Sequence, residues 1–165
     1  MRTIILTSLA MGAMAASVGT TLAQSAPPPA YGETINSETA KKAAAAAVAE
    51  ATKNNWGMCV AVVAPSGDLV YFERMDNCQY ASITISQHKA KAAAIFRRPT
   101  KVFEDVLVAG GAGIRMLAFS PDLLPVEGGV PLIEGGLVVG AIGVSGMQSY
   151  QDGQVAAAGA RVLGG

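Results

Sequence analysis

Residues 58–74, MCVAVVAPSGDLVYFER, decide the fold. Met58 to Ala64 is a short apolar run rich in valine, which is typical of a strand covered on both faces. The cluster from Pro65 to Asp68 predicts a turn, and Leu69 to Arg74 is a second run rich in branched and aromatic residues. The stretch therefore predicts a β-hairpin.

A second hairpin is predicted downstream. Val130 to Ile133 and Leu137 to Val144 are apolar runs, and Gly135-Gly136 between them is a two-residue turn. Because neither hairpin contains a crossover helix, the sheet is expected to be antiparallel. With helices packed on it, the fold class is α+β.

Four helices are predicted from apolar residues at three- and four-residue spacing. The first has an alanine face, which allows close approach, so it is expected to lie flat on the sheet. The predicted bounds are Ser37 to Asn54-Asn55, about Ser82 to Phe96 with a stop at Pro99, Thr100 to about Leu107, and a last helix opened by a Ser149–Asp152 capping box.

The N-terminus predicts export. Residues 1–23 have a basic Arg2, an apolar segment from Ile4 to Val18 and a small-residue site ending at Ala23, as in a signal peptide. We therefore expect a periplasmic or secreted protein in which a Pro-rich tether, 24–36, precedes a single domain, 37–165. Later apolar stretches are too short to span a membrane. Twelve basic and twelve acidic side chains exclude the basic footprint of a nucleic-acid binder.

The two cysteines leave a disulfide open. Exported proteins form disulfides, and Cys59 and Cys78 are the only cysteines. A two-residue turn in the first hairpin places Cys59 opposite Arg74, with Cys78 four residues further on. If the strand continued straight, the offset of about 13 Å would exceed the reach of a disulfide. A bend at Asp76-Asn77 would bring the cysteines together.

Familiar catalytic motifs are incomplete. Gly140 to Gly146 has glycines spaced G-x-x-G-x-x-G, which does not match the dinucleotide fingerprint. Ser145 lacks the final glycine of a nucleophile elbow. One histidine and two cysteines cannot complete a structural zinc site without carboxylates. No catalytic residue is assigned, and whether the protein is an enzyme stays open.

The single histidine lies on the second predicted helix. On a helical wheel Ile85, Ala92 and Phe96 form an apolar stripe, with His88 at its edge and Lys89 inside it. A lysine there must extend its ammonium to the edge or meet an anion. With Arg97 and Arg98 nearby, the region has the composition of a haem pocket. The residues alone favour the alternative that His88 packs at a helix edge and the cations face solvent.

Several short motifs, taken in order, resemble the haem-binding HbpS–GlcG family. This family is also described as haem-degrading and is related to the C-terminal domain of a cobalamin adenosyltransferase. Ala64 and Ala92 depart from the family pattern, which usually has Asp and Thr there. The motifs are the Ala-rich first helix, Arg74-Met75-Asp76, Lys89-Ala90, Phe96-Arg97-Arg98-Pro99-Thr100, Gly128-Gly129-Val130-Pro131, Gly140 to Gly146, and Gln151-Asp152.

The resemblance implies an antiparallel sheet of about five strands, flanked by helices in profilin-like α/β/α layers. It also implies haem binding and homo-oligomers, from dimers to octamers. From the helical wheel we predict His88 as the iron ligand. Phe96 is expected to line the pocket, and Lys89, Arg97 or Arg98 to meet the propionates.

A competing hypothesis is an enzyme or accessory factor for a small organic acid, glycolate-like or aromatic. The same cationic region would bind the carboxylate, and Ser145 or Asp152 would act at a glycine-lined edge. The two hypotheses share a region of the sequence and differ in the ligand.

Overall fold

The computed structural model describes residues 27–164, so the predicted signal peptide, 1–23, lies outside the described residues. Among them, four strands form one antiparallel sheet in the order β2-β1-β4-β3. About five strands were expected; the N-terminal segment adds only an isolated parallel bridge, between Tyr31 and Val138. The strands are β1 (Cys59–Val63), β2 (Leu69–Arg74), β3 (Gly129–Glu134) and β4 (Leu137–Ser145).

Both predicted hairpins are confirmed. In the first, Cys59 pairs with Arg74 as expected, but a register shift between Val62 and Val63 pairs Val63 with Leu69, so the two-residue turn is wrong and three residues lie between Ala64 and Asp68. In the second, Gly135 and Gly136 have φ values of 56° and 80°, which suit glycine in a tight hairpin turn.

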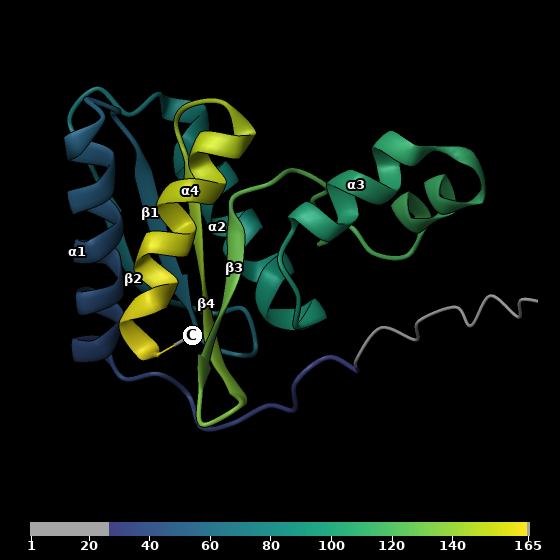
Figure 1. Ribbon diagram of the computed structural model, residues 1–165, viewed down its shortest axis with the longest axis horizontal. Helices are drawn as coiled ribbons and strands as arrows, with labels where there is room; N and C mark the ends of the chain where they lie inside the picture. The colour runs from purple at the N-terminus through teal and green to yellow at the C-terminus, as the bar shows by residue number, and fades with distance from the viewer. Residues whose placement is uncertain (1–26, 165) are drawn as a thin grey trace, which may run out of the picture.

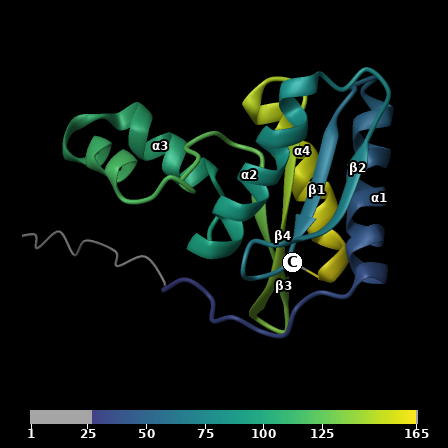
Figure 2. The same cartoon turned by 180° about the vertical axis from the view of Figure 1, so that it is seen from behind.

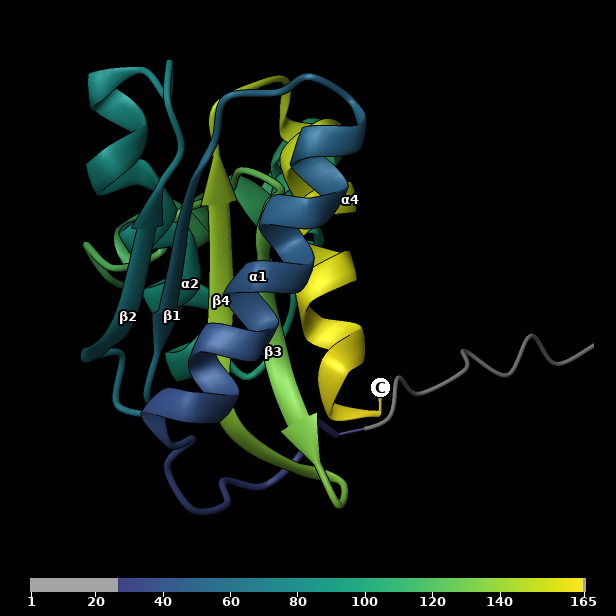
Figure 3. The same ribbon diagram turned by 90° about the vertical axis from the view of Figure 1, so that its left-hand side faces the viewer.

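Helices cover both faces of the sheet and confirm the α/β/α layers. Helices α1 (Ser37–Lys53) and α4 (Ser149–Ala160) lie on one face (Figure 3), and α2 (Tyr80–Phe96) lies on the other. Side chains of β1 alternate accordingly: Val60 and Val62 pack in the cluster with α1 and α4, whereas Ala61 and Val63 pack with the alanines of α2. None of the helices in residues 27–164 is long and apolar enough to cross a membrane.

An arm projects from this layered body. It comprises α3 (Lys101–Ala109) and the 3-10 helix η1 (Gly111–Ala118), and both Figure 1 and Figure 2 show α3 leading away from the sheet. Large apolar side chains are exposed along it and just beyond it: Val102, Val106, Val108, Ile114, Leu117 and Phe119. A second short 3-10 helix, η2 (Arg161–Leu163), follows α4.

The face that α2 turns to the sheet differs from the predicted stripe. Its buried face is made of small residues, including Ser82, Ser86, Ala90 and Ala93. This face lies about a quarter turn from Ile85 on the helical wheel. The reason is on the strand below, where a Cβ added at Gly143 would lie 2.1 Å from the carbonyl oxygen of Ser86. The sheet therefore accepts the helix backbone itself, which only small side chains permit.

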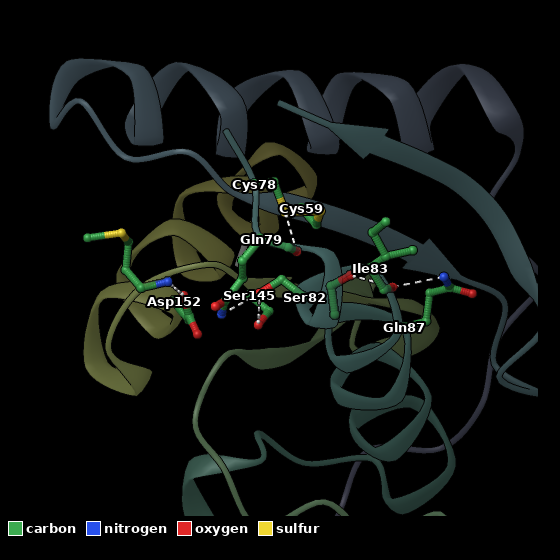
Figure 4. The surroundings of a disulfide bond; sticks show 10 residues. Cys59, Cys78, Gln79, Ser82, Ile83, Gln87, Ser145 and Asp152 are labelled. Atoms are coloured by element: carbon green, nitrogen blue, oxygen red, sulfur yellow. Dashed lines mark hydrogen bonds between the residues drawn. A yellow bond between two sulfur atoms is a disulfide. The ribbon is translucent and has the colours of Figure 1, made fainter. Parts of the chain in front are cut away.

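The disulfide is formed. Cys59 and Cys78 are bonded, with Cα atoms 5.8 Å apart (Figure 4). Asn77 has a φ of 64°, and the Cys78 amide donates to the carbonyl of Met75. The straight continuation that argued against the bridge is therefore wrong, because the chain reverses directly after β2.

Two predicted caps move by one residue. Asn36, rather than Ser37, caps α1, and its side-chain oxygen accepts a hydrogen bond from the Thr39 amide at 2.8 Å. At α4 the predicted Ser149–Asp152 box is wrong. The side chain of Gln151 instead accepts from the Gln148 amide at 3.1 Å, which leaves Asp152 to point inward.

Candidate functional site

Two adjoining cavities meet at the junction of α2 and α3. Their volumes are about 470 and 440 Å³, within the range of small-molecule pockets. Both are lined by Pro28, Arg97, Arg98 and Val102. We call the two together the groove. Its first cavity adds Pro27, Pro29, Pro99, Val130, Pro131 and Ile133; its second adds Ile95, Phe96, Phe103, Val106, Met116, Phe119 and Leu123.

The end of α2 sets the position of the two arginines. Arg97 has a φ of 54°, a left-handed conformation that closes the helix, and its amide donates to the carbonyl of Ala94. The next turn is anchored to the sheet at Thr100, whose hydroxyl accepts a hydrogen bond from the Gly129 amide at 2.9 Å. The backbone therefore holds Arg97 and Arg98 at the groove.

The groove combines an apolar wall with two arginines, of which one is paired among the described residues and the other is not. Phe96 and Phe103 contact edge to face, with ring centroids 5.3 Å apart. Arg97 donates to the carbonyl of Pro29 at 3.1 Å and lies over the ring of Tyr31 at 5.1 Å. No side-chain hydrogen bond or ion pair of Arg98 is found within residues 27–164. The guanidinium of Arg98 is therefore the one available to an anionic ligand.

Three of the five predicted site residues come together here. Phe96, Arg97 and Arg98 line the groove. His88 is exposed and lines neither cavity. It lies two turns before Phe96, about 12 Å along the helix axis. In the part of the chain that the structure describes, no cluster of three metal-binding side chains exists. Sequence reasoning missed Met116, whose thioether is an atom type that binds haem iron.

Lys89 has a different partner. It is 1% exposed, and its ammonium lies 2.7 Å from the carboxylate of Asp152, which is 3% exposed. A Cβ at Gly128 would lie 2.8 Å from the Lys89 Nζ, so the glycine makes room for the ammonium. Of the two fates predicted for a lysine in this stripe, it meets an anion. The predicted contact with a propionate has no basis in this geometry, because Lys89 lines neither cavity.

Asp152 is held by more than the lysine. Its second carboxylate oxygen accepts from the Met147 amide at 3.0 Å. Burial raises the pKa of Asp152, while the Lys89 ammonium and the backbone amides of Met147 and Gly146 act in the opposite direction. The pair joins α2 to α4 across 63 residues of sequence. The sequence therefore predicts that Lys89 needs an anion but does not identify Asp152 as its partner.

The residues named by the enzyme hypothesis are buried. Ser145 is 4% exposed, and its hydroxyl donates to that of Ser82 at 3.0 Å (Figure 4). Asp152 is committed to Lys89. Neither side chain lines the groove, so this geometry places no nucleophile or free carboxylate beside Arg98.

Fold and groove together define a small α+β domain with an apolar groove that carries two arginines, a candidate ligand site. A family model described as "Haem degrading protein HbpS-like" matches residues 35–161. Protein GlcG of Escherichia coli (strain K12) is 41% identical over 111 residues, which are 67% of this chain and 81% of that protein. The chain belongs to the HbpS-like family.

Solved structures agree with this assignment. A double mutant of Streptomyces reticuli HbpS has a TM-score of 0.72 and 32% identity, and the match covers 94% of this chain and 99% of that one. The PduOC:heme complex has a TM-score of 0.70 and covers 79% of this chain and 96% of that one. Its identity is 21%, so it shows a shared fold alone.

Proposed function

We propose that this protein binds haem in the groove at the α2–α3 junction. The observation that carries the proposal is the combination of an aromatic and aliphatic lining with the unpaired guanidinium of Arg98. An apolar cavity takes the porphyrin face, and a guanidinium suits a propionate. The description of the family model and the haem complex of PduOC, a protein of the same fold, support the same ligand.

Haem would supply redox-active iron to the site, and the chain's own residues would bind and orient it. Phe96 and Phe103 line the apolar wall, and Arg98 would hold a propionate. Two residues are candidates for the iron. His88 is the ligand predicted from the helical wheel but lies outside the groove, whereas Met116 lines it. Sequestration, sensing and slow degradation are all consistent with such a site.

Hemin titration tests the proposal. We expect the Soret band to shift and saturate with the native chain. Arg98→Ala is expected to raise the dissociation constant for hemin about tenfold, since a charge-assisted hydrogen bond is lost. Arg115→Ala, on the exposed surface of η1 outside the groove lining, is the control and should bind normally. Absence of any Soret shift in the native chain would refute haem binding.

The same titration assigns the iron ligand. His88→Ala and Met116→Leu leave the guanidinium of Arg98 in place. A changed Soret maximum in the His88→Ala complex would assign the iron to His88, and a change confined to Met116→Leu would assign it to Met116.

A small organic acid is the second candidate ligand. The free guanidinium of Arg98 favours it, because a carboxylate needs no more than such a cation in an otherwise apolar cavity. Thermal stabilisation by glycolate-like or aromatic acids, without a hemin response, would favour this ligand. The burial of Ser145 and Asp152 gives that candidate no catalytic group in the groove.

Export to the periplasm or outside the cell is part of the proposal. The signal-like residues 1–23 support it, and so does the Cys59–Cys78 disulfide, because disulfides persist in oxidising compartments. We expect the protein recovered from the periplasm or medium to begin at Gln24 and to resist alkylation at both cysteines until reduced. Mass spectrometry checks both; an intact Met1 with two alkylated cysteines would contradict export.

Self-association is proposed from the exposed apolar surface of the arm. Val108 is 81% exposed and Phe119 is 68% exposed, and such side chains gather where proteins meet one another. We expect light scattering to give a mass of at least a dimer. A monomer at micromolar concentration would contradict the oligomer.

A further inference from the structure

The segment from Pro27 to Tyr31, which we call the strap, forms part of the groove wall. Pro27, Pro28 and Pro29 line the first cavity, and Pro28 also lines the second. Pro28 therefore lies where the two cavities adjoin. These residues lie in the segment predicted as a tether, and the contacts that they make are specific.

Hydrogen bonds hold the strap at three of its residues, Pro29, Ala30 and Tyr31. The Tyr31 hydroxyl donates to the carbonyl of Ile95 at 2.8 Å, one of the carbonyls left free at the end of α2. The carbonyl of Ala30 accepts from the Val138 amide at 2.8 Å, at the start of β4. The carbonyl of Pro29 accepts from the Arg97 guanidinium at 3.1 Å. The strap is thus attached both to the sheet and to the end of the helix.

Arg97 acts on the strap rather than on the centre of the groove. Its guanidinium bonds to the Pro29 carbonyl and covers the Tyr31 ring, so both of its strong interactions are with the strap. Three consecutive prolines also stiffen the strap, which lowers the entropy lost when it covers a ligand.

We propose that the strap is a ligand-contacting wall of the groove, that Tyr31 and Arg97 are positioning residues that hold it there, and that Arg98 alone meets the ligand carboxylate. This inference rests on the proposed haem function. A wall that contacts the ligand in both cavities slows its release for as long as the wall stays attached. Weakening its attachment should therefore act mainly on the dissociation rate.

The test uses the full chain with hemin as the probe. Tyr31→Phe keeps the ring beneath Arg97 and removes only the hydroxyl, and we expect it to raise the hemin dissociation rate about three- to tenfold. Arg97→Ala should raise it at least as much, and Arg97→Lys should restore part of the loss. Tyr150→Phe is the matched control, because Tyr150 is 63% exposed and is not a groove residue.

The rate of chymotrypsin cleavage after residue 31 provides a second readout. Hemin would not change this rate if the strap had only a structural role. Chymotrypsin cleaves after residue 31 whether this residue is Tyr or Phe. We expect hemin to slow this cleavage in the native chain while cleavage after Tyr80, which is 80% exposed, is unaffected. Tyr31→Phe should be cleaved faster without hemin. Should Arg97→Ala fail to fold, Tyr31→Phe alone decides the outcome.

The outcomes separate the two proposals. If the native chain does not bind hemin, the proposed function fails. If it binds hemin but Tyr31→Phe dissociates at the rate of Tyr150→Phe, and hemin gives no protection after residue 31, the strap inference is overturned while haem binding stands.

Discussion

Lys89→Met is expected to lower the free energy of unfolding by about 3 to 5 kcal/mol. The variant leaves the carboxylate of Asp152, 3% exposed in the native chain, without its cation. A buried charge that has lost its partner keeps its desolvation cost and loses the attraction that offsets it. Chemical denaturation followed by circular dichroism measures the change.

Two controls isolate the charge. Lys91 lies on the same helix as Lys89, and Lys91→Met breaks its 2.8 Å ion pair with Asp122, which follows η1. Because these side chains are 40% and 37% exposed, that pair is worth at most about 1 kcal/mol. Lys89→Met combined with Asp152→Asn removes both charges and keeps a side-chain oxygen for the Met147 amide. This double variant should recover at least half of the loss. A loss below about 1 kcal/mol for Lys89→Met alone would contradict a stabilising pair.

The cost of Lys89→Met should also depend on pH. Burial already raises the pKa of Asp152, and removing the lysine removes the largest opposing influence. A carboxyl whose pKa is higher in the folded than in the unfolded chain stabilises the fold at low pH and loses that contribution as pH rises through the folded pKa. The variant should therefore lose less stability at pH 5 than at pH 8. Equal losses at both values would show that Asp152 does not take up the proton.

Gly143→Ala is expected to destabilise the protein by about 3 kcal/mol or more, at or above the upper end for overpacked cores. The new Cβ would lie 2.1 Å from the Ser86 oxygen and 2.3 Å from the Ala90 nitrogen. Both are backbone atoms of α2, so no change of rotamer relieves the overlap, and the helix has to move off β4. Denaturant unfolding measures the loss.

Gly136→Ala is the matched control for this overlap. Gly136 lies in the turn between β3 and β4, has a φ of 80°, and no heavy atom lies within 4 Å of an added Cβ. Only the left-handed backbone penalises alanine there, by about 1 to 2 kcal/mol. If Gly143→Ala cost no more than Gly136→Ala, the close contact between α2 and β4 would be refuted.

The elements themselves could be predicted because their signals are local. The valine-rich run of β1, the turn at Gly67 and the paired glycines at 135–136 each specify structure within a few residues. Cap positions erred by one residue, because Asn36 and Ser37 are both good N-caps and sequence does not rank them.

The candidate site was predictable in part. Phe96, Arg97 and Arg98 are adjacent in the chain, so their gathering at one helix end follows from the sequence. The face of α2 was not predictable in the same way. The helical wheel predicts that the face with the largest apolar side chains packs on the sheet. In the structure the face with Ser86 and Ala90 packs there instead, because Gly143 has no side chain and lets the helix backbone approach β4. That quarter turn places His88 on the surface, whereas Lys89 is buried on the observed face as it was on the predicted one.

By itself, the sequence determined the α+β class, the two hairpins, four of the helices and the family resemblance, because periodicity and turn chemistry act over short stretches. The Cys59–Cys78 bond, the Lys89–Asp152 pair and the contact of the strap with Arg97 depend on tertiary packing. Each of these joins segments 19 to 68 residues apart. Their partners are chosen by how closely backbones approach and by which buried charges must be neutralised, and these depend on the packed layers as a whole.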